Sequence, residues 1–288
     1  MCSVFAYYFA NKKVRLYHRR RQEPQELPSR QTAMPLANET VERFSGRVED
    51  YVRYRPGYPD AVVNILRTEL GLTDQMVIAD IGPGPGTSTE IFLRHGFTVI
   101  GVEPNLEMRA AANYRLQGYP QFHSVAGSAE ATTLDDASVD LVIAAQAFHW
   151  FDVPAARREF ARILRPPGRV ALLWNTMRTN TPFLRDYEDL LQRFGTDYRQ
   201  VHHKNLSDAV FHSFFAPGWK KSILDNVQPF DLAGVQGRLR SSSFVPAKGQ
   251  PNFAPMMAEV KRIFEQHQVS GQVIFEYDTE LYLGLVEA

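Results

Sequence analysis

The first residues whose chemistry stands out are three glycines, Gly82, Gly84 and Gly86, flanked by the acids Asp80 and Glu103. The glycines follow a short apolar run, and glycine both tolerates positive φ and lets a ligand approach the backbone closely. A helix expected directly after them would point unpaired N–H groups at this turn. The second acid ends the next apolar run, about 20 residues on, where a carboxylate can accept hydrogen bonds from ribose hydroxyls. The pattern therefore predicts a nucleoside-binding turn.

The turn departs from the dinucleotide-binding fingerprint in two respects. That fingerprint, Gly-x-Gly-x-x-Gly, needs a third glycine where this chain has Thr87. In addition, Asp80 places negative charge where it would repel a pyrophosphate and attract a cation. The stretch from Asp80 to Gly86, Asp-x-Gly-x-Gly-x-Gly, resembles motif I of the class I S-adenosylmethionine-dependent methyltransferases. This resemblance implies S-adenosylmethionine as the cofactor and Glu103 as the acid that binds its ribose.

The resemblance also implies a wider set of cofactor contacts. In similar methyltransferases the loop after the third strand contacts adenine, and here Ser128 stands at the usual position of an Asp. A plain connecting loop is the alternative interpretation. The residues implied in cofactor binding are Asp80, Gly82, Gly84, Gly86, Glu103, Pro104, Asn105, Ser128, Ala129, Glu130, Gln146 and Ala147.

Residues 146–151, Gln-Ala-Phe-His-Trp-Phe, follow the expected fourth strand, at the edge where the reactive methyl group should lie. The segment is similar to that of the type 11 methyltransferases, and trans-aconitate methyltransferases have a comparable sequence there. The resemblance runs from about Thr40 through Trp174, roughly half of the chain. The chain has no Asn/Asp-Pro-Pro-Tyr motif, which argues against amide or nucleobase amines as acceptors. It also lacks the acid that metal-dependent catechol enzymes carry at this place, so we expect no metal.

His149 is the candidate catalytic residue. Methyl transfer from a sulfonium is an in-line displacement, and holding the reactants in line contributes up to about 7–11 kcal/mol. Imidazole titrates close to physiological pH, so His149 can act as a base if the acceptor arrives protonated; contact with the substrate and a structural role are the alternatives.

The segment before the core is rich in tyrosine and arginine. In similar proteins it folds over the cofactor and helps to form the acceptor pocket, where Arg53 or Arg55 would bind an acceptor carboxylate. An amphipathic helix with solvated arginines is the alternative. The residues proposed for acceptor binding are Tyr51, Arg55, Phe148, His149 and Trp150.

Alternating apolar runs and amphipathic stretches predict an α/β fold. Strands are expected at 77–81, 98–102, 122–126, 139–144, 170–174, 219–230 and 273–286. Helices are expected at 38–55, 60–70, 88–94, 105–116, 152–164, 181–194, 206–215, 232–240 and 255–267. Right-handed crossovers then place the carboxyl ends of the parallel strands along one edge of a doubly wound sheet. The resemblance makes this a Rossmann-like sheet of seven mostly parallel strands, with the seventh antiparallel.

The expected organisation is one enzyme domain with additions. Residues 1–37 form an N-terminal extension, expected to be mobile because polar residues and prolines dominate its second half. A helical cap at 38–59 opens the methyltransferase domain, 38–288. Residues 176–217, between strands five and six, form an insertion where relatives often build a substrate lid.

Composition limits the partners that we expect. The 288 residues include 32 basic and 32 acidic side chains, so no net charge draws the chain to nucleic acid or anionic membranes. The single cysteine, Cys2, excludes an intrachain disulfide. No apolar run approaches the roughly 20 residues of a spanning helix. We expect a soluble, cytoplasmic protein, although the basic N-terminal stretch leaves organelle targeting open, and the sequence is silent on oligomeric state.

The sequence thus predicts an S-adenosylmethionine-dependent methyltransferase acting on a small organic acceptor. A carboxylate acceptor is favoured by resemblance alone, because one fold and one cofactor site serve many acceptors. An NAD(P)-dependent oxidoreductase, which shares the sheet and the ribose acid, is one alternative. A non-catalytic S-adenosylmethionine-binding protein is the other.

Overall fold

The computed structural model describes residues 14–20, 47–196, 198, 207–216 and 218–287. Their strands form one eight-stranded sheet in the order β1-β7-β8-β6-β5-β2-β3-β4. The strands are β1 (Val14–Arg20), β2 (Val77–Ile81), β3 (Thr98–Val102), β4 (Phe122–Val125), β5 (Val139–Ala145), β6 (Leu164–Met177), β7 (Gly218–Phe230) and β8 (Val273–Leu285). β2 to β6 pair in parallel, whereas β8 runs antiparallel to both of its neighbours, β6 and β7. The predicted seven-stranded, mostly parallel, doubly wound sheet with an antiparallel last strand is confirmed.

The eighth strand, β1, was not expected from the sequence. It lies in the N-terminal extension and pairs antiparallel with β7, from Val14 opposite Leu224 to Arg20 opposite Gly218. The outer edge of β7 offers unpaired backbone N–H and C=O groups, which an extended chain can pair with whatever its side chains. The polar and proline-rich composition, on which the expectation of a mobile extension rested, carries no information about such pairing. The rest of the extension, and residues 38–46 of the expected cap helix, lie outside the described residues.

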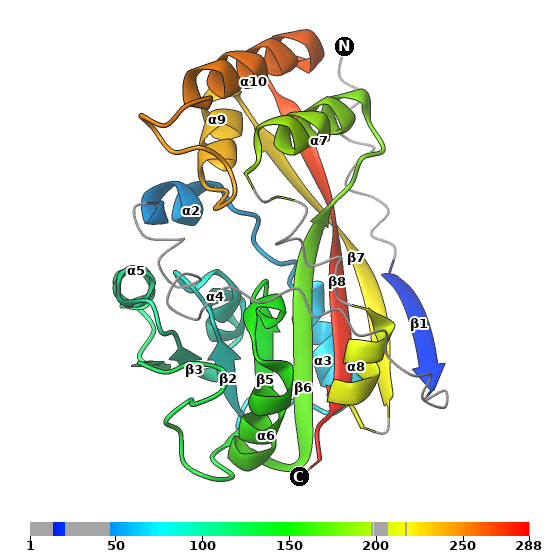
Figure 1. The fold of residues 1–288 in the computed structure, drawn as a ribbon. Coiled ribbons are helices and arrows are strands. Elements are labelled where there is room, and N and C mark those ends of the chain that lie inside the picture. Colours follow the sequence, from blue (N-terminus) through cyan, green and yellow to red (C-terminus); the bar gives the residue numbers. More distant parts are fainter. Residues whose placement is uncertain (1–13, 21–46, 197, 199–206, 217, 288) are drawn as a thin grey trace.

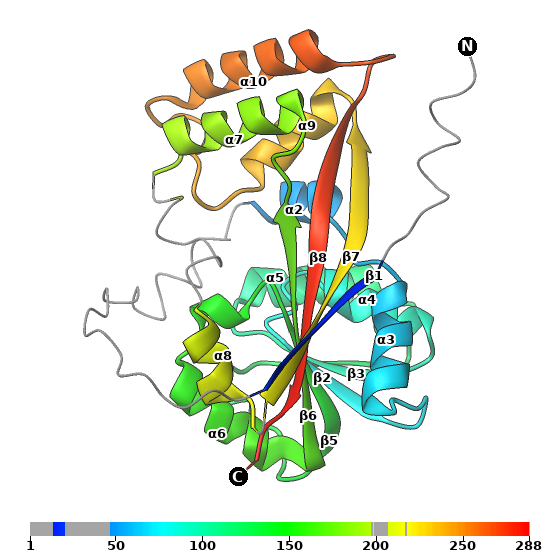
Figure 2. The ribbon, with the colours of Figure 1, turned by 90° about the vertical axis from the view of Figure 1, so that its right-hand side faces the viewer.

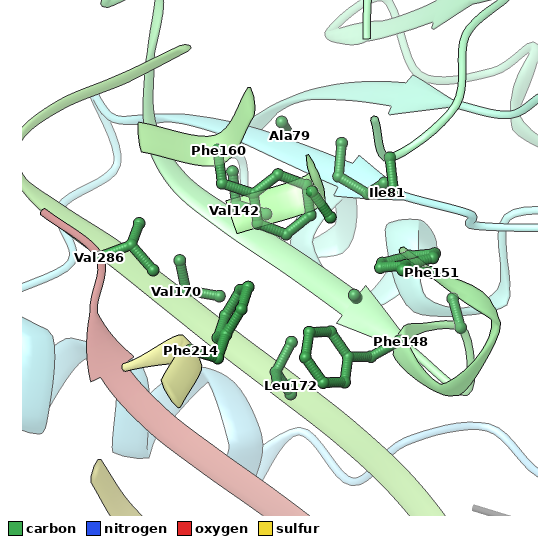
Figure 3. Packing of buried hydrophobic residues seen from close by; sticks show 14 of the residues in the cluster. Ala79, Ile81, Val142, Phe148, Phe151, Phe160, Val170, Leu172, Phe214 and Val286 are labelled. Carbon is green, nitrogen blue, oxygen red and sulfur yellow. The ribbon is translucent and has the colours of Figure 1, made fainter. Parts of the chain in front are cut away.

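Two hydrophobic layers cover the sheet. On one face α3 (Ala61–Leu70) and α4 (Thr87–Arg94) pack with buried residues such as Val63 and Phe92, joined by α5 (Leu106–Leu116). On the other face α6 (Val153–Ile163) and α8 (Asp208–Phe214) bury Phe160 and Phe214 against β5 and β6, and Figure 3 shows part of this cluster. Each burial of a large apolar side chain contributes about 1.5–3 kcal/mol, so these layers make the sheet a rigid platform.

The helices begin where the sequence provides caps. The Asn105 side chain accepts a hydrogen bond from the Met108 N–H at the start of α5, and the Asp152 side chain accepts one from the Ala155 N–H at the start of α6. These contacts satisfy N–H groups that have no partner within the helix. α3 ends at Gly71, whose φ of 64° is left-handed.

A third layer lies beyond the carboxyl ends of the parallel strands. β6, β7 and β8 are longer than the other strands, and α7 (Pro182–Phe194), α9 (Leu232–Arg240) and α10 (Phe253–His267) pack around their far ends (Figures 1 and 2). Between this layer and the sheet lies α2 (Val48–Tyr54), the described part of the expected cap. Arg240 at the end of α9 binds Asp50 of α2 through two hydrogen bonds of 2.8 and 2.9 Å.

The expected insertion at 176–217 divides between two places. Its first helix, α7, joins the third layer, where Phe183 and Tyr187 pack on Phe275 of β8. Its second helix, α8, packs on the face of the sheet beside α6. Of these two helices, α7 is the one that lies beyond the carboxyl edge of the parallel strands (Figure 1). None of the helices in the described ranges has both the length and the apolar character needed to traverse a bilayer.

Candidate functional site

The turn between β2 and α4 has the backbone shape that glycine alone adopts easily. Gly82, Gly84 and Gly86 have φ values of 68°, 55° and 84°. A Cβ on Gly82 would lie 2.9 Å from the Cβ of Ala147, closer than such atoms approach. At Gly84 a Cβ would meet just the sulfur of Met108, at an ordinary contact distance of 4.0 Å. The turn therefore leaves its backbone accessible to a ligand.

Asp80, at the end of β2, is completely buried beneath this turn. Its Oδ2 accepts hydrogen bonds from the hydroxyls of Ser88 (2.7 Å) and Thr89 (2.8 Å) in the first turn of α4. Its Oδ1 is buried and has no hydrogen-bond partner. Burial raises the pKa of Asp80 to about 7, although the two hydroxyls oppose this change. The site thus holds a carboxylate that is half satisfied and ready to accept a donor or a cation.

Glu103 faces the turn from the end of β3. Its Oε2 accepts the Gly84 N–H at 3.0 Å, and its Oε1 accepts the Asn105 N–H at 2.9 Å. Burial raises the pKa of Glu103, while these two backbone bonds and nearby Arg109 lower it. A carboxylate has about four lone-pair positions, so these two bonds leave capacity for further donors. Pro104 follows directly and is exposed, and Asn105 caps α5.

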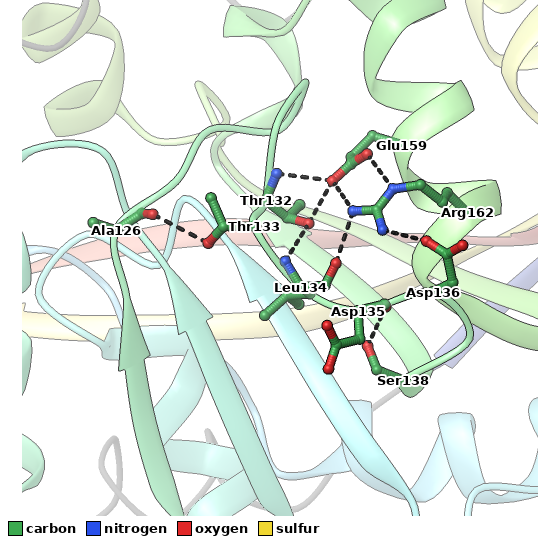
Figure 4. Close-up of polar contacts among 9 residues, drawn as sticks. All are labelled: Ala126, Thr132, Thr133, Leu134, Asp135, Asp136, Ser138, Glu159 and Arg162. Carbon is green, nitrogen blue, oxygen red and sulfur yellow. Dashed lines mark hydrogen bonds and ion pairs between the residues drawn. The ribbon is translucent and has the colours of Figure 1, made fainter.

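The loop at 128–130 is held by a polar network at its back. Glu159 of α6 accepts both the N–H (2.9 Å) and the hydroxyl (2.6 Å) of Thr132, and Arg162 donates to the same carboxylate (Figure 4). Arg162 lowers the pKa of Glu159 to about 2, so this acid stays ionised. Ala129 is buried, and Glu130 accepts the N–H of Asp152 at 2.9 Å. The Glu130 carboxylate thus helps to position α6.

In the loop, Ser128 closes a tight turn of its own. Its N–H donates to the Ala131 carbonyl at 3.1 Å, and its carbonyl accepts the Ala131 N–H at 3.3 Å. The Ser128 side chain is half-buried. Whether this loop binds adenine stays a prediction.

The segment after β5 separates into a buried and an accessible part. Gln146 adopts a φ of 58°, and its Nε2 donates to the Asn175 carbonyl at 3.1 Å. Phe148, which the sequence analysis placed in the acceptor site, is 0% exposed and packs edge-on against Phe214 at 4.7 Å. The structure therefore assigns Phe148 to the core, because the short helical turn at 148–150 directs it inward. Ala147 is buried beside the glycine turn.

His149 is half-buried, and its ring lies 4.9 Å from that of Trp150. The Trp174 indole N–H donates to the His149 Nδ1 at 3.4 Å. Since Trp174 can only donate, this contact favours the neutral tautomer that carries its proton on Nε2. In that tautomer His149 donates a hydrogen bond through Nε2, whereas a general base acting through Nε2 requires the opposite tautomer. The geometry thus supports substrate contact better than proton abstraction.

The expected acceptor residues of the cap lie against the third layer. The Arg55 guanidinium lies over the Tyr51 ring, 5.2 Å from its centre, and donates to the Ser241 carbonyl at 2.9 Å. Arg53 instead is exposed and lies over Tyr54. Of the two arginines considered from the sequence, only Arg55 points inward.

The fold brings to this region several polar residues that the sequence did not predict. Ser88 and Thr89 contact Asp80, and Trp174 contacts His149. The first two stand directly after the glycine turn, so the start of α4 is a signal that points to them. No comparable signal marks Arg238 of α9, which is buried near Arg55. Among the described residues, no group of three or more His, Cys, Asp or Glu side chains is placed to hold a metal ion.

Comparisons with known proteins show likeness to methyltransferases. Residues 79–172 match the model of a family described as a methyltransferase domain. An uncharacterized methyltransferase of Mycobacterium tuberculosis is 37% identical over 156 residues, which cover 54% of this chain and 61% of that protein. The malonyl-[acyl-carrier protein] O-methyltransferase of Marinomonas sp. is 26% identical over 78% of this chain and 84% of its own length.

A solved structure extends the likeness in fold to most of the chain. A protein of Anaeromyxobacter dehalogenans described as a type II methyltransferase superimposes with a TM-score of 0.63, at 24% identity, over 81% of this chain and 99% of its own. The alignments with the first curated relatives span about three fifths of those proteins, 60% and 61% of their lengths. Residues 79–172, which match the family model, contain the glycine turn, both acids and the segment at 146–151. Residues 79–172 of this chain are thus similar to the methyltransferase-domain family.

Proposed function

We propose that this protein is an S-adenosylmethionine-dependent methyltransferase that acts on a small organic acceptor. The observation that carries the proposal is the pair of buried acids on either side of the glycine turn, each with unused capacity to bind. Asp80 has a buried oxygen without a partner, and Glu103 has accepted only two backbone N–H groups. The likeness of the segment that contains them to the methyltransferase-domain family supports the same function.

The residues present fit the cofactor at its two polar ends. The ammonium group of its methionine part suits the unpaired Oδ1 of Asp80, because a buried carboxylate gains most from a cation. The ribose hydroxyls suit the remaining lone pairs of Glu103. Gly84, which has no side chain, allows the backbone between them to come close. The same acid at position 80 would oppose a dinucleotide pyrophosphate, so the oxidoreductase alternative is not favoured.

When bound, S-adenosylmethionine supplies an electrophilic methyl group on a sulfonium. The protein's own part is to hold the acceptor in line with that group and to keep water away. The third layer and α2 lie over the carboxyl edge of the sheet and serve the second purpose (Figure 2). His149, through its Nε2–H, orients the acceptor, and Tyr51 and Trp150 line its approach.

The acceptor is proposed to be small, because the layer formed by α2, α7 and α9 covers the carboxyl edge. An acceptor that carries a carboxylate agrees with the malonyl group in the name of the relative from Marinomonas sp.. A binding protein without catalytic activity would bind the cofactor equally well, and it differs only in showing no turnover with any acceptor.

Calorimetric titration with S-adenosylhomocysteine tests the cofactor site. Glu103→Gln removes the charge from hydrogen bonds that contribute about 1.5–3 kcal/mol each, so affinity should fall at least about tenfold. Glu90→Gln is the matched control, because Glu90 lies in nearby α4 and pairs with Arg115 at 2.6 Å. Unchanged affinity in Glu103→Gln, or tighter binding of NADH than of S-adenosylhomocysteine by the native chain, would refute the assignment.

A further inference from the structure

We propose that Arg55 and Arg238 form an anion site that anchors a carboxylate of the acceptor, between α2, α9 and β8. This inference rests on the proposed methyltransferase function and specifies the class of its substrate. The anchored carboxylate is a recognition group, because a carboxylate held by two guanidinium groups is a poor nucleophile. The atom that receives the methyl group then belongs to another part of the acceptor.

The first observation is that these two arginines have no acidic partner among the described residues. Arg238 is only 9% exposed, and the Arg55 Nε is completely removed from solvent. By contrast, the partly buried Arg178 is paired with Asp225 and Asp278. Removing a cation from water without a counter-ion is costly. Binding of an anion beside these arginines would offset that cost.

The second observation concerns the hydrogen bonds that these groups make and lack. Arg238 donates to the Tyr277 hydroxyl and to the Ser242 hydroxyl, both at a long 3.3 Å. The Arg55 Nε has no partner, and neither has the buried hydroxyl of Tyr187. Unsatisfied N–H and O–H donors in a buried region are the groups that a carboxylate binds.

Hydrogen bonds place the two arginines near one another, because Arg55 donates to the Ser241 carbonyl and Arg238 donates to the hydroxyl of the adjacent Ser242. The pKa of Arg55 is lowered to about 10, first by burial and then by the charge of Arg238. Tyr187 and Tyr277 interact with both arginines, and each raises the pKa of Arg238. Both guanidiniums remain charged at neutral pH, and they repel one another. An anion between them would relieve the repulsion.

The cluster lies on the same side of the sheet as the cofactor turn. Hydrogen bonds of Asn175, in β6, connect the two. Its carbonyl accepts the Nε2 of Gln146, in the segment after β5, at 3.1 Å, and its side chain donates to the Gly57 carbonyl at 3.1 Å. Gly57 stands two residues after Arg55 in the chain.

A structural explanation competes with this one. The carbonyl end of α9 carries partial negative charge, which attracts arginine side chains. Arg47 has this role, since it donates to the carbonyls of Arg240, Ser242 and Val245. Arg55 makes one bond of this kind, to Ser241, which leaves its Nε without a partner. Helix capping therefore accounts for Arg47 fully and for Arg55 only in part.

The test uses the full chain saturated with S-adenosylhomocysteine, with succinate, inorganic phosphate and neutral succinamide as probes in calorimetry. Succinate should bind and succinamide should not. Arg238→Met should weaken succinate binding at least tenfold without changing affinity for S-adenosylhomocysteine, and Arg238→Lys should restore part of it. Arg47→Met, the matched control, should bind succinate normally. Loss of S-adenosylhomocysteine binding in the native chain would instead contradict the proposed function itself.

A second measurement does not depend on the choice of probe. In buffer with chloride as its only anion, Arg238→Met should melt at the same temperature as the native chain or higher, because it removes an unpaired buried charge. Arg47→Met should melt at a lower temperature. If Arg238→Met melts as low as Arg47→Met, or if no probe binds, the arginine pair is structural and the inference is overturned. Preference for phosphate over succinate would overturn the assignment of a carboxylate.

Discussion

Replacement of Asp80 by asparagine should change how stability depends on pH. The pKa of Asp80 rises from 3.8 to about 7 in the folded protein because the carboxyl group is completely buried. Between these two values the unfolded chain has released the proton while the folded chain retains it. Stability therefore falls as pH rises through this window, and it becomes constant above the folded pKa.

The size of the effect follows from the shift. Each pKa unit is worth about 1.4 kcal/mol, so the full penalty above pH 7 is about 4 kcal/mol. About 3 kcal/mol of it develops between pH 5 and pH 8. In Asp80→Asn the amide oxygen can still accept the hydroxyls of Ser88 and Thr89, and the variant has no titrating group here. Any cost of the buried amide nitrogen is independent of pH.

The assay is chemical denaturation of the native chain and of Asp80→Asn from pH 5 to pH 8, without cofactor. The stability of the native chain relative to the variant should fall by about 3 kcal/mol across this range. Ser88→Ala is an informative control, because the Ser88 hydroxyl lowers the pKa of Asp80 and its loss should move the window to higher pH. Parallel stability curves for the native chain and Asp80→Asn would refute the reasoning. The affinity of the native chain for S-adenosylhomocysteine should also rise as pH increases through 7, because the ammonium group of the ligand favours the ionised Asp80 carboxylate. The affinity of Asp80→Asn should not change in this way.

Two further predictions concern residues beside the site. Phe148→Leu should lower the free energy of unfolding by about 1–3 kcal/mol, because Phe148 packs edge-on against Phe214. The same variant should leave the acceptor KM unchanged. A raised KM would return Phe148 to the acceptor site. Gly82→Ala should destabilise the protein by about 1–3 kcal/mol in thermal or chemical denaturation. Gly82 has a φ of 68°, and the new Cβ would meet the Cβ of Ala147. Full native stability would show that the turn can relax.

Local sequence patterns were sufficient to predict most of the elements. The apolar run at 77–81 and the glycines after it predict β2 and its turn, because strand length and left-handed φ depend on neighbouring residues only. Asn105 and Asp152 marked the starts of α5 and α6 for the same reason. The acids Asp80 and Glu103 were also identified, since parallel strands bring their carboxyl ends to one edge.

Other features depend on contacts between distant parts of the chain. The pairing of β1 with β7 uses backbone groups, so no side-chain pattern announces it. Phe148 looked like a site residue, yet residues more than 60 positions away enclose it in the core.

The sequence by itself determined the cofactor turn, its two acids and the order of strands and helices, because these follow from short-range geometry and from the handedness of crossovers. Only the tertiary structure decided which polar side chains are buried without partners. Arg55 and Arg238 are far apart in the chain, and only the packing of α9 on α2 brings them together. Burial and charge compensation are properties of the packed molecule, which is why the anion site has no local signature.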